Sequence, residues 1–442
     1  MERLIGLLWV PQVSSDLFVG RNQFAYRSGR GSRHALAYVV LSWLECFLRK
    51  CRVGMYLSDV SGAFDRVRAE RLLQKMRAKR IPEEVVAIVG SWLRGRAAHI
   101  VVGGQKSTAM QLLNQVFQGT CWGPVLWNLF YEDSNAAIES AEFTEVKFAD
   151  DLNAFKEFDP KVEDAAIYDA MGQCQTKLHQ WGAANQVAFD ASKEGKRILS
   201  RSRPSGDPFL LLGVSFDCSL IMDVAINDLV KHCRWKLRTL LRSQRHFEAN
   251  SLVNLYKSRM LGFIEYRTAA IYHASDTLLQ PLDSIQRRFL EQIGATETEA
   301  LCCFNLAPLA SRRDIAMLGL IHRAVLGKGS PHFQQFFSLK GGVPPAGRHR
   351  LQVVEYRQGD YTDFLFPGSR PAEYIARSGL GLTTVYNLLP ADVVEASGTV
   401  AVFQAKLQDI LRHQAIKGAH SWSRTFSPRW GITNHPLRNL CP

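Results

Sequence analysis

An Asp pair set between apolar runs constrains this chain more than any other feature. Val146–Ala149 leads into Asp150 and Asp151, and apolar residues follow, as in a β-hairpin with acids at its turn. An isolated Asp pair is usually a solvated turn. Buried like charges repel one another, so an acid pair between apolar strands needs a cation. The pattern therefore predicts a hairpin that carries a cation site.

A third acid follows another apolar run far upstream. Val53–Ser58 has the pattern of a strand and ends at Asp59. Mg²⁺ prefers carboxylate oxygens, with substrate phosphates completing its shell. Two such ions about 3.5–4 Å apart can clamp the attacking and leaving oxygens of an in-line phosphoryl displacement. Asp59, Asp150 and Asp151 are therefore predicted to hold two Mg²⁺ ions.

A glycine-rich loop lies between the two acidic motifs. Gln118–Pro124 contains Gly119 and Gly123, which allow close approach of the backbone to a ligand, and it precedes the apolar run Val125–Tyr131. Pro124 suits the first turn of a helix. In this order, the Asp59 motif, the Gln118 motif and the Phe148-Ala149-Asp150-Asp151 motif resemble the palm of reverse transcriptases. The resemblance is closest to the enzymes of non-LTR (LINE, jockey-like) retrotransposons.

The resemblance covers roughly residues 2–325. The other matching segments are the finger segment Gln23–Arg30, the stretch Trp181–Lys193, the primer-grip hairpin Leu211–Asp217 and the thumb segment Asp283–Leu290. Relatives carry an additional strand upstream of a helix like Glu2–Gly6, so the chain is expected to be N-terminally truncated. No endonuclease or ribonuclease H region is evident, so DNA cleavage is expected to be supplied elsewhere.

The resemblance implies an α+β fold of the right-hand polymerase type. The expected regions are partial fingers (1–48), a palm with an antiparallel sheet and inserted finger and helix elements (49–222) and a helical thumb and connector (223–326). A Gly- and Pro-rich stretch is expected to be a linker (327–347). The remainder (348–442) is expected to be a small, mainly helical region of unknown role.

The resemblance also assigns roles to single residues. Asp59, Asp150 and Asp151 would be the catalytic carboxylates and metal ligands, and Val60 would add its carbonyl oxygen as a ligand. Nucleotide-binding roles fall to Phe64, Gln118, Gly119, Arg27, Arg30 and Lys193, and the primer grip to Leu212, Gly213 and Val214.

Three of these assignments have a plain structural alternative. Phe64 would be the sugar gate, because a ring beneath the ribose clashes with a 2′-OH; otherwise it is a core residue. Lys193 could neutralise or protonate the pyrophosphate leaving group; otherwise it is a solvated surface lysine. Arg27 and Arg30 could contact the triphosphate in bidentate fashion; otherwise they belong to a basic loop.

Composition agrees with a polyanionic partner. The net charge is +13 and the pI is about 9.4, which fits nucleic acid binding. The nine cysteines are irregularly spaced and include no Cys-x-x-Cys pair, so a zinc ribbon is not expected. Irregular cysteines without a signal peptide indicate an intracellular protein, in the nucleus or cytoplasm as a ribonucleoprotein. No stretch approaches the length of a membrane span.

The leading prediction is an RNA-directed DNA polymerase. It would extend a DNA primer on an RNA template with dNTPs and two Mg²⁺ ions, with Mn²⁺ as a substitute. One alternative is an inactive remnant that only binds nucleic acid, and another is a group II intron-type maturase. A viral RNA-dependent RNA polymerase is disfavoured, because Phe64 places a large ring where a ribonucleotide needs room.

Overall fold

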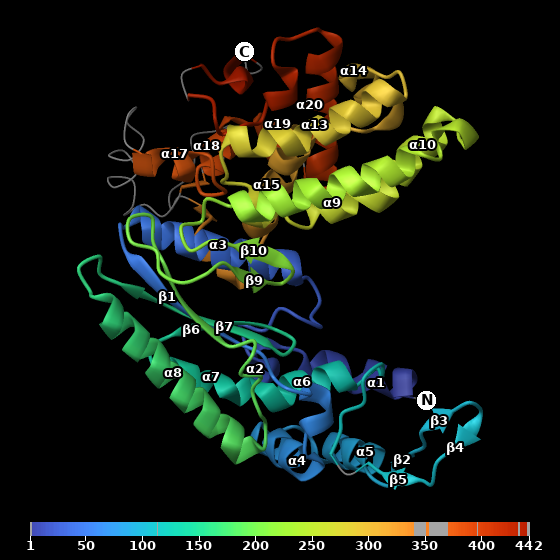
Figure 1. The fold of residues 1–442 in the computed structure, drawn as a ribbon, viewed down its shortest axis with the longest axis vertical. Coiled ribbons are helices and arrows are strands. Elements are labelled where there is room, and N and C mark those ends of the chain that lie inside the picture. Colours follow the sequence, from blue (N-terminus) through green and yellow to red (C-terminus); the bar gives the residue numbers. More distant parts are fainter. Residues whose placement is uncertain are drawn as a thin grey trace. The chain divides into compact units, whose positions relative to one another are not determined.

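A computed structural model describes residues 2–112, 114–339, 351–352, 370–395, 397–431 and 434–439 (Figure 1). It separates into two compact units. The first unit comprises Met1–Ala35 and Lys50–Gly206, and the second comprises Leu36–Arg49 and Asp207–Pro442. The five regions expected from the sequence are finer than this division, and their boundaries stay predictions.

A four-stranded antiparallel sheet forms the centre of the first unit. Its strands are β1 (Arg52–Ser58), β6 (Thr144–Phe148), β7 (Asp151–Phe158) and β8 (Gly195–Leu199), in the order β6-β7-β1-β8. Every residue of β1 is buried, as expected of an apolar strand with a partner on each side. Ser58 pairs with Leu152, and Leu57 with Gly195. The end of β1, the β6–β7 turn and the start of β8 therefore meet at one edge of the sheet.

Helices cover this sheet and close the core of the first unit. Helix α8 packs on β1 and β8, and α7 packs on β6 (Figure 1). Aromatic residues of α6 lie in the same core, among them Trp127 and Phe130. The helices of this unit are α1 (Glu2–Val13), α2 (Asp16–Val19), α4 (Ala69–Ala78), α5 (Glu83–Leu93), α6 (Gly123–Tyr131), α7 (Asn135–Glu139) and α8 (Asp164–Asn185).

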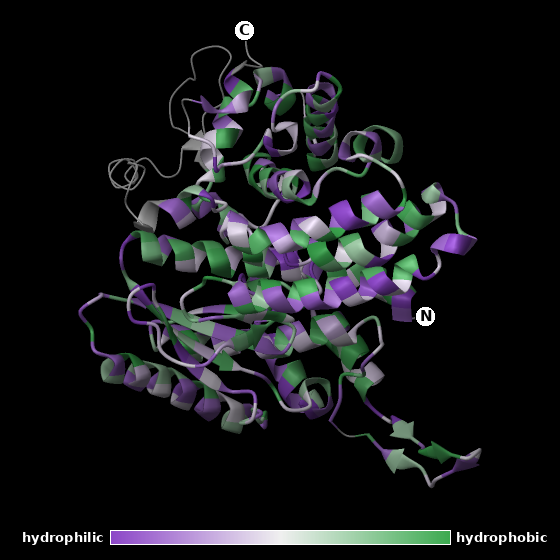
Figure 2. Cartoon of the chain, turned by 45° about the horizontal axis from the view of Figure 1, so that its top comes forward, coloured by the Kyte–Doolittle hydropathy of each residue, from purple (hydrophilic) through white to green (hydrophobic). Residues whose placement is uncertain are grey.

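A narrow β-ribbon extends from the first unit. It consists of β2 (Ala97–Ala98) paired with β5 (Met110–Gln111), and β3 (Val101–Val102) paired with β4 (Gln105–Lys106). Gly103 and Gly104 form its tip with positive φ angles of 57° and 81°. Apolar residues of the ribbon are exposed, and parts of its strands are coloured green, as hydrophobic, in Figure 2.

The second unit is mainly helical. A hairpin of β9 (Phe209–Leu211) and β10 (Val214–Phe216) precedes its helices, and Trp43 of α3 (Ser32–Leu48) packs on Phe209 and Phe216. Helix α9 lies against α13, and α15 lies against α20. The helices are α9 (Asp223–Leu241), α10 (Ala249–Tyr256), α11 (Gly262–Glu265), α12 (Thr268–Ile271), α13 (Asp276–Gln292), α14 (Glu297–Phe304), α15 (Leu309–Val325), α17 (Arg370–Ala376), α18 (Leu382–Leu388), α19 (Ala391–Glu395) and α20 (Val400–Ile416).

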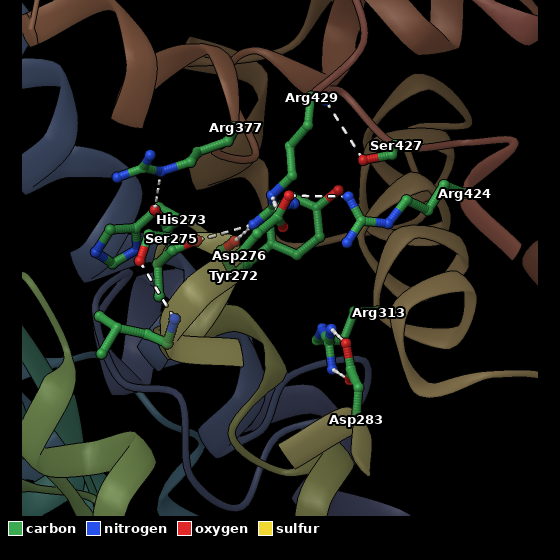
Figure 3. Close-up of polar contacts among 12 residues, drawn as sticks. Tyr272, His273, Ser275, Asp276, Asp283, Arg313, Arg377, Arg424, Ser427 and Arg429 are labelled. Carbon is green, nitrogen blue, oxygen red and sulfur yellow. Dashed lines mark hydrogen bonds and ion pairs between the residues drawn. The ribbon is translucent and has the colours of Figure 1, made fainter. Parts of the chain in front are cut away.

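The C-terminal segment is tied to these helices by arginines (Figure 3). Arg424 and Arg429 pair with Asp276 at 2.9 and 2.8 Å. Arg429 also donates to the carbonyl oxygens of Tyr272 (3.1 Å) and Ala274 (2.9 Å). These contacts make the C-terminal segment part of the second unit.

The stretch expected to be a linker is only partly described. Residues 331–335 form a 3₁₀ turn that is followed by the buried Phe336 and Phe337, and β11 (Ser338–Leu339) pairs with β12 (Leu351–Gln352). Residues 340–347 of that stretch lie outside the described residues. The α+β fold class expected from the sequence is confirmed. Among the described helices, none has the length and apolarity needed to cross a bilayer.

Candidate active site

The turn of the β6–β7 hairpin is held by two buried side chains. Ala149 has a φ of +59°, in the left-handed region that alanine rarely adopts. Its N–H donates to Gln23 Oε1 (2.9 Å), and Gln23 Nε2 donates back to its carbonyl oxygen (3.1 Å). Trp127 Nε1 donates to the same carbonyl at 3.1 Å. Three hydrogen bonds from two side chains therefore hold the turn that carries Asp150.

Asp59 lies one residue beyond β1 and is 9% exposed. The ammonium of Lys193 lies 2.5 Å from Asp59 Oδ2. Backbone hydrogen bonds hold the two segments together: Asp190 N–H donates to the Asp59 carbonyl, and Ser61 N–H donates to the Ala188 carbonyl, both at 2.9 Å. Residues 188–194, here called the lysine loop, therefore run alongside the end of β1.

The three carboxylates predicted from the sequence influence one another electrostatically. Burial, and after it the charges of Asp59 and Asp150, raises the pKa of Asp151 to about 6. Burial, with the charge of Asp59, also raises the pKa of Asp150. Asp59 in turn raises the pKa of Lys193, which keeps its ammonium protonated. The structure thus brings Asp59, Asp150, Asp151 and Lys193 together.

The carboxylate oxygens of Asp59, Asp150 and Asp151 are of the chemical type that binds a hard divalent cation. Carboxylate oxygens are what Mg²⁺ prefers, and a cation would relieve the repulsion that raises the pKa values of Asp150 and Asp151. Within the described residues, however, no group of three or more Asp, Glu, His or Cys side chains has the geometry of a metal-binding site. Val60, the predicted carbonyl ligand, is buried and forms an antiparallel bridge with Phe189.

Phe64 lies beside this cluster, in a 3₁₀ turn (Ala63–Arg66), and is 8% exposed. Its ring stacks on Trp127 with the centroids 5.9 Å apart. The exposed Tyr26 meets Phe64 edge-on at 6.5 Å. Phe64 therefore has core contacts on one face, and its role as a sugar gate stays a prediction.

The glycine-rich loop presents its polar residues to solvent. Gln118 and Gly119 are exposed, and Gly119 has a φ of +80° that favours glycine. The loop is anchored by the buried Trp122, whose Nε1 donates to the Glu2 carbonyl (2.9 Å). Contact of Gln118 and Gly119 with a templating base pair stays a prediction.

Arg27 and Arg30 form ion pairs and hydrogen bonds with residues of the segment that precedes them. Their guanidinium groups both pair with Asp16, at 2.5 and 2.7 Å, and Arg27 also donates to the Gly20 carbonyl at 2.7 Å. Both side chains are largely buried. The structure does not bring them to the carboxylates in this arrangement, and their contact with a triphosphate stays a prediction.

The predicted primer grip belongs to the second unit. Leu212 and Gly213 form the β9–β10 turn with φ angles of 47° and 73°, and the buried Val214 begins β10. Tyr266 Oη donates to the Leu212 carbonyl (2.7 Å), and Arg267 donates to the Gly213 carbonyl (3.3 Å). The turn is well held, and its primer contact stays a prediction.

Sequence reasoning missed the residues that support the site. Gln23 and Trp127 hold the turn before Asp150, and Glu194 of the lysine loop accepts a hydrogen bond from Tyr56 of β1. Gln23 occurs in a segment that matched the family, but no spacing pattern connects it with Ala149, since the two residues meet only in the folded chain.

The chain is similar to proteins of known family. Residues 11–203 match the model of the family described as reverse transcriptase (RNA-dependent DNA polymerase). The RNA-directed DNA polymerase from mobile element jockey of Drosophila melanogaster is 28% identical over 318 residues, covering 66% of this chain and 34% of the relative. The probable RNA-directed DNA polymerase from transposon X-element of the same fly is 23% identical over 314 residues, covering 67% and 34%. The chain thus spans about a third of the length of these curated relatives.

Likeness to solved structures is remote. Apo telomerase from Candida tropicalis is 11% identical with a TM-score of 0.39, covering 66% of this chain and 54% of that one. Telomerase from the same yeast with a fragment of telomeric RNA is 11% identical with a TM-score of 0.38, covering 75% and 50%.

Proposed function

This chain contains a reverse transcriptase domain of the non-LTR, LINE type, and from that premise we propose that it is an RNA-directed DNA polymerase. It would extend a DNA primer on an RNA template with dNTPs. The observation that carries this proposal is the meeting of Asp59, Asp150 and Asp151 at one edge of the sheet. The relatives that it matches come from retrotransposons, which favours this function over that of a group II intron maturase.

The three carboxylates would hold Mg²⁺, with Mn²⁺ as a substitute. The bound ions would supply positive charge for the attacking and leaving oxygens of the displacement. The primer 3′-oxygen loses its proton to solvent and bonds to the α-phosphorus of the dNTP, and the bond from that phosphorus to the bridging oxygen breaks. Lys193, kept protonated by Asp59, gives a proton to the departing pyrophosphate and regains one from solvent.

A groove in the second unit supports nucleic acid binding. It has a volume of about 440 Å³ and is lined by residues of α9 and α13 and by Leu241 and Arg242 at the end of α9. Leu237 and Ile285 form a buried apolar floor. Its arginines are Arg234, Arg238, Arg242 and Arg288.

These arginines are available to a ligand. Among the residues that the structure describes, none of the four pairs with a carboxylate. Arg234 and Arg238 lie on α9 and Arg242 directly follows it, at intervals of four residues, which sets their backbone positions about 6 Å apart. Such a row suits the repeating charge of a sugar-phosphate strand.

The expected partners are therefore an RNA template and a DNA primer or target, in a ribonucleoprotein of the nucleus or cytoplasm. A separate endonuclease would cleave the target DNA.

Primer extension tests the proposal. The purified chain is incubated with a DNA primer annealed to an RNA template, dNTPs and Mg²⁺, with and without EDTA. We expect extension that requires the RNA template and is abolished by EDTA. Tight binding of the hybrid without any extension would instead identify a non-catalytic protein that only binds nucleic acid.

A further inference from the structure

Glu194 is a buried acid for which the reaction has no evident use. Its side chain is 8% exposed, although it directly follows the exposed Lys193. Glu194 Oε1 accepts hydrogen bonds from the hydroxyl of Tyr56 and from His179 Nε2, the latter at 2.8 Å. Gln175 Nε2 donates to Glu194 Oε2 at 3.0 Å. Three close donors from two elements thus converge on one carboxylate, and the Ser58 hydroxyl of β1 lies farther from Oε1, at 3.5 Å.

These donors lie on the rigid part of the first unit. Tyr56 is fully buried in the central strand β1, and Gln175 and His179 lie one helical turn apart on α8, which packs on β1 (Figure 1). His179 also stacks on Phe189 of the lysine loop, with the ring centroids 5.0 Å apart. The lysine loop is therefore attached to α8 at both of its ends.

The strand register connects Glu194 with the catalytic cluster. Leu57 pairs with Gly195 in the antiparallel β1–β8 ladder. The ladder ends there: the chain turns at Lys193, whose N–H donates to the Asp190 carbonyl, and pairing with the end of β1 resumes at Asp190 and Phe189. Glu194 thus lies between the ladder and this turn, directly next to the lysine that contacts Asp59. A shift of the chain at Glu194 would move Lys193 away from the carboxylates.

We propose that Glu194 is a positioning residue, which anchors the lysine loop on Tyr56, Gln175 and His179 so that the Lys193 ammonium stays at the carboxylate cluster. This inference rests on the proposed function. Lys193 is itself long, exposed and flexible, so the geometry of proton transfer depends on where its backbone is held. An acid suits the anchor because only a carboxylate accepts from all three donors at once.

A double-mutant cycle tests whether Glu194 acts through Lys193. Primer extension is measured for Lys193→Ala, Glu194→Ala and the double variant. We expect Glu194→Ala to lower kcat about 10- to 100-fold, the scale of a misplaced catalytic group, with KM for dNTP nearly unchanged. The double variant should be no slower than Lys193→Ala. Losses that multiply in the double variant would overturn the inference.

Two further variants separate positioning from general damage. Glu194→Gln keeps the acceptor for Tyr56 and His179 and loses the bond from Gln175, so its kcat should lie between those of the parent and Glu194→Ala. Glu142→Ala removes an exposed glutamate that pairs with Lys156 at 2.6 Å and should leave kcat at the parent value. A Glu194→Gln variant as slow as Glu194→Ala would contradict the role given to the hydrogen bonds.

Hydrogen exchange gives a readout that does not need activity. The amides of Asp190 and Lys193 are hydrogen-bonded in the lysine loop, so peptides spanning 188–194 should exchange slowly in the parent and faster in Glu194→Ala. Peptides from α20 serve as the internal reference. Unchanged exchange in 188–194 would overturn the inference, whereas a parent chain that never extends a primer would overturn the proposed function alone.

Discussion

Two demands compete at Phe64. Its ring packs on Trp127 in the core of the first unit, yet it lies in the turn that directly follows the Asp59 segment. A core residue contributes through burial, and a gate contributes through a clash with a 2′-OH. The clash exists only with a nucleotide bound, so a substitution assayed for both stability and sugar selection separates these contributions.

Phe64→Ala should change sugar selection. Relief of the clash is expected to raise kcat/KM for rNTPs relative to dNTPs, because discrimination reflects differential contact with the two substrates. Loss of packing should also lower stability by about 3–5 kcal/mol. Extension with each nucleotide type is measured beside thermal unfolding. Phe143→Ala, at another buried position in the same core, should lower stability without changing the ratio. An unchanged ratio for Phe64→Ala would make it a core residue only.

Asp314 should make stability depend on pH. Burial raises its pKa to about 6, although Tyr272 Oη donates to it at 2.7 Å. The folded pKa exceeds the ordinary value near 3.9, so this contribution to stability is complete below about pH 4 and is lost as pH rises through 6. The loss is on the order of 3 kcal/mol. The free energy of unfolding is measured with urea at pH 4.5 and 7.5. The value for Asp314→Asn relative to the parent should be higher at pH 7.5 than at pH 4.5.

A second variant checks this assignment. Tyr272→Phe removes the hydrogen bond that favours the ionised Asp314, so the pH at which stability is lost should move upward. Parallel stability curves for the parent and Asp314→Asn between pH 4.5 and 7.5 would show that Asp314 does not carry this dependence.

At the scale of elements, the β6–β7 hairpin depends on a side chain far away in sequence. Gln23 accepts from the N–H groups of Ala149 and Ala25 and donates to the Ala149 carbonyl. Because these groups are buried, each one left without a partner would cost about 1–3 kcal/mol. The clamp thus offsets the strain of a left-handed alanine next to Asp150.

Gln23→Leu should therefore damage both stability and catalysis. The nearly isosteric side chain leaves the buried N–H groups of Ala149 and Ala25 unpaired, while the Ala149 carbonyl keeps only its bond from Trp127. We expect a fall in melting temperature together with a lower kcat from a displaced Asp150. Gln12→Leu, which removes an exposed glutamine of α1, serves as the matched control and should change neither. A stable Gln23→Leu variant with the parent kcat would exclude the clamp as a support of the site.

The strands and helices of the site could be predicted because each has a local signal. Val53–Ser58 is apolar along its length, and β1 (Arg52–Ser58) follows that run. Pro124 falls in the first turn of α6, as expected. The position of Lys193 against Asp59 and the clamp by Gln23 could not be predicted, since both depend on contacts between distant segments. The ion pairs of Arg27 and Arg30 with Asp16 could not be predicted for the same reason.

At the scale of the whole molecule, the division into units follows contacts that no linear pattern shows. Residues 36–49 group with the second unit, where Trp43 packs on Phe209 and Phe216. The C-terminal segment, to which the sequence assigned no chemistry, is bound by Arg424 and Arg429 to Asp276. The carboxylates that we propose as catalytic and the arginine groove lie in different units, so catalysis and nucleic acid binding should respond to different substitutions.

The comparison of Asp150→Asn with the parent chain tests the central claim most directly. Primer extension and filter binding of the RNA–DNA hybrid are measured on the same preparations, with Asp169→Asn on the exposed side of α8 as the matched control. Catalysis depends on the carboxylates and binding on the basic surfaces. We predict that Asp150→Asn abolishes extension and leaves hybrid binding nearly intact. Extension that survives in Asp150→Asn, or an equal loss of extension and binding, would contradict the account.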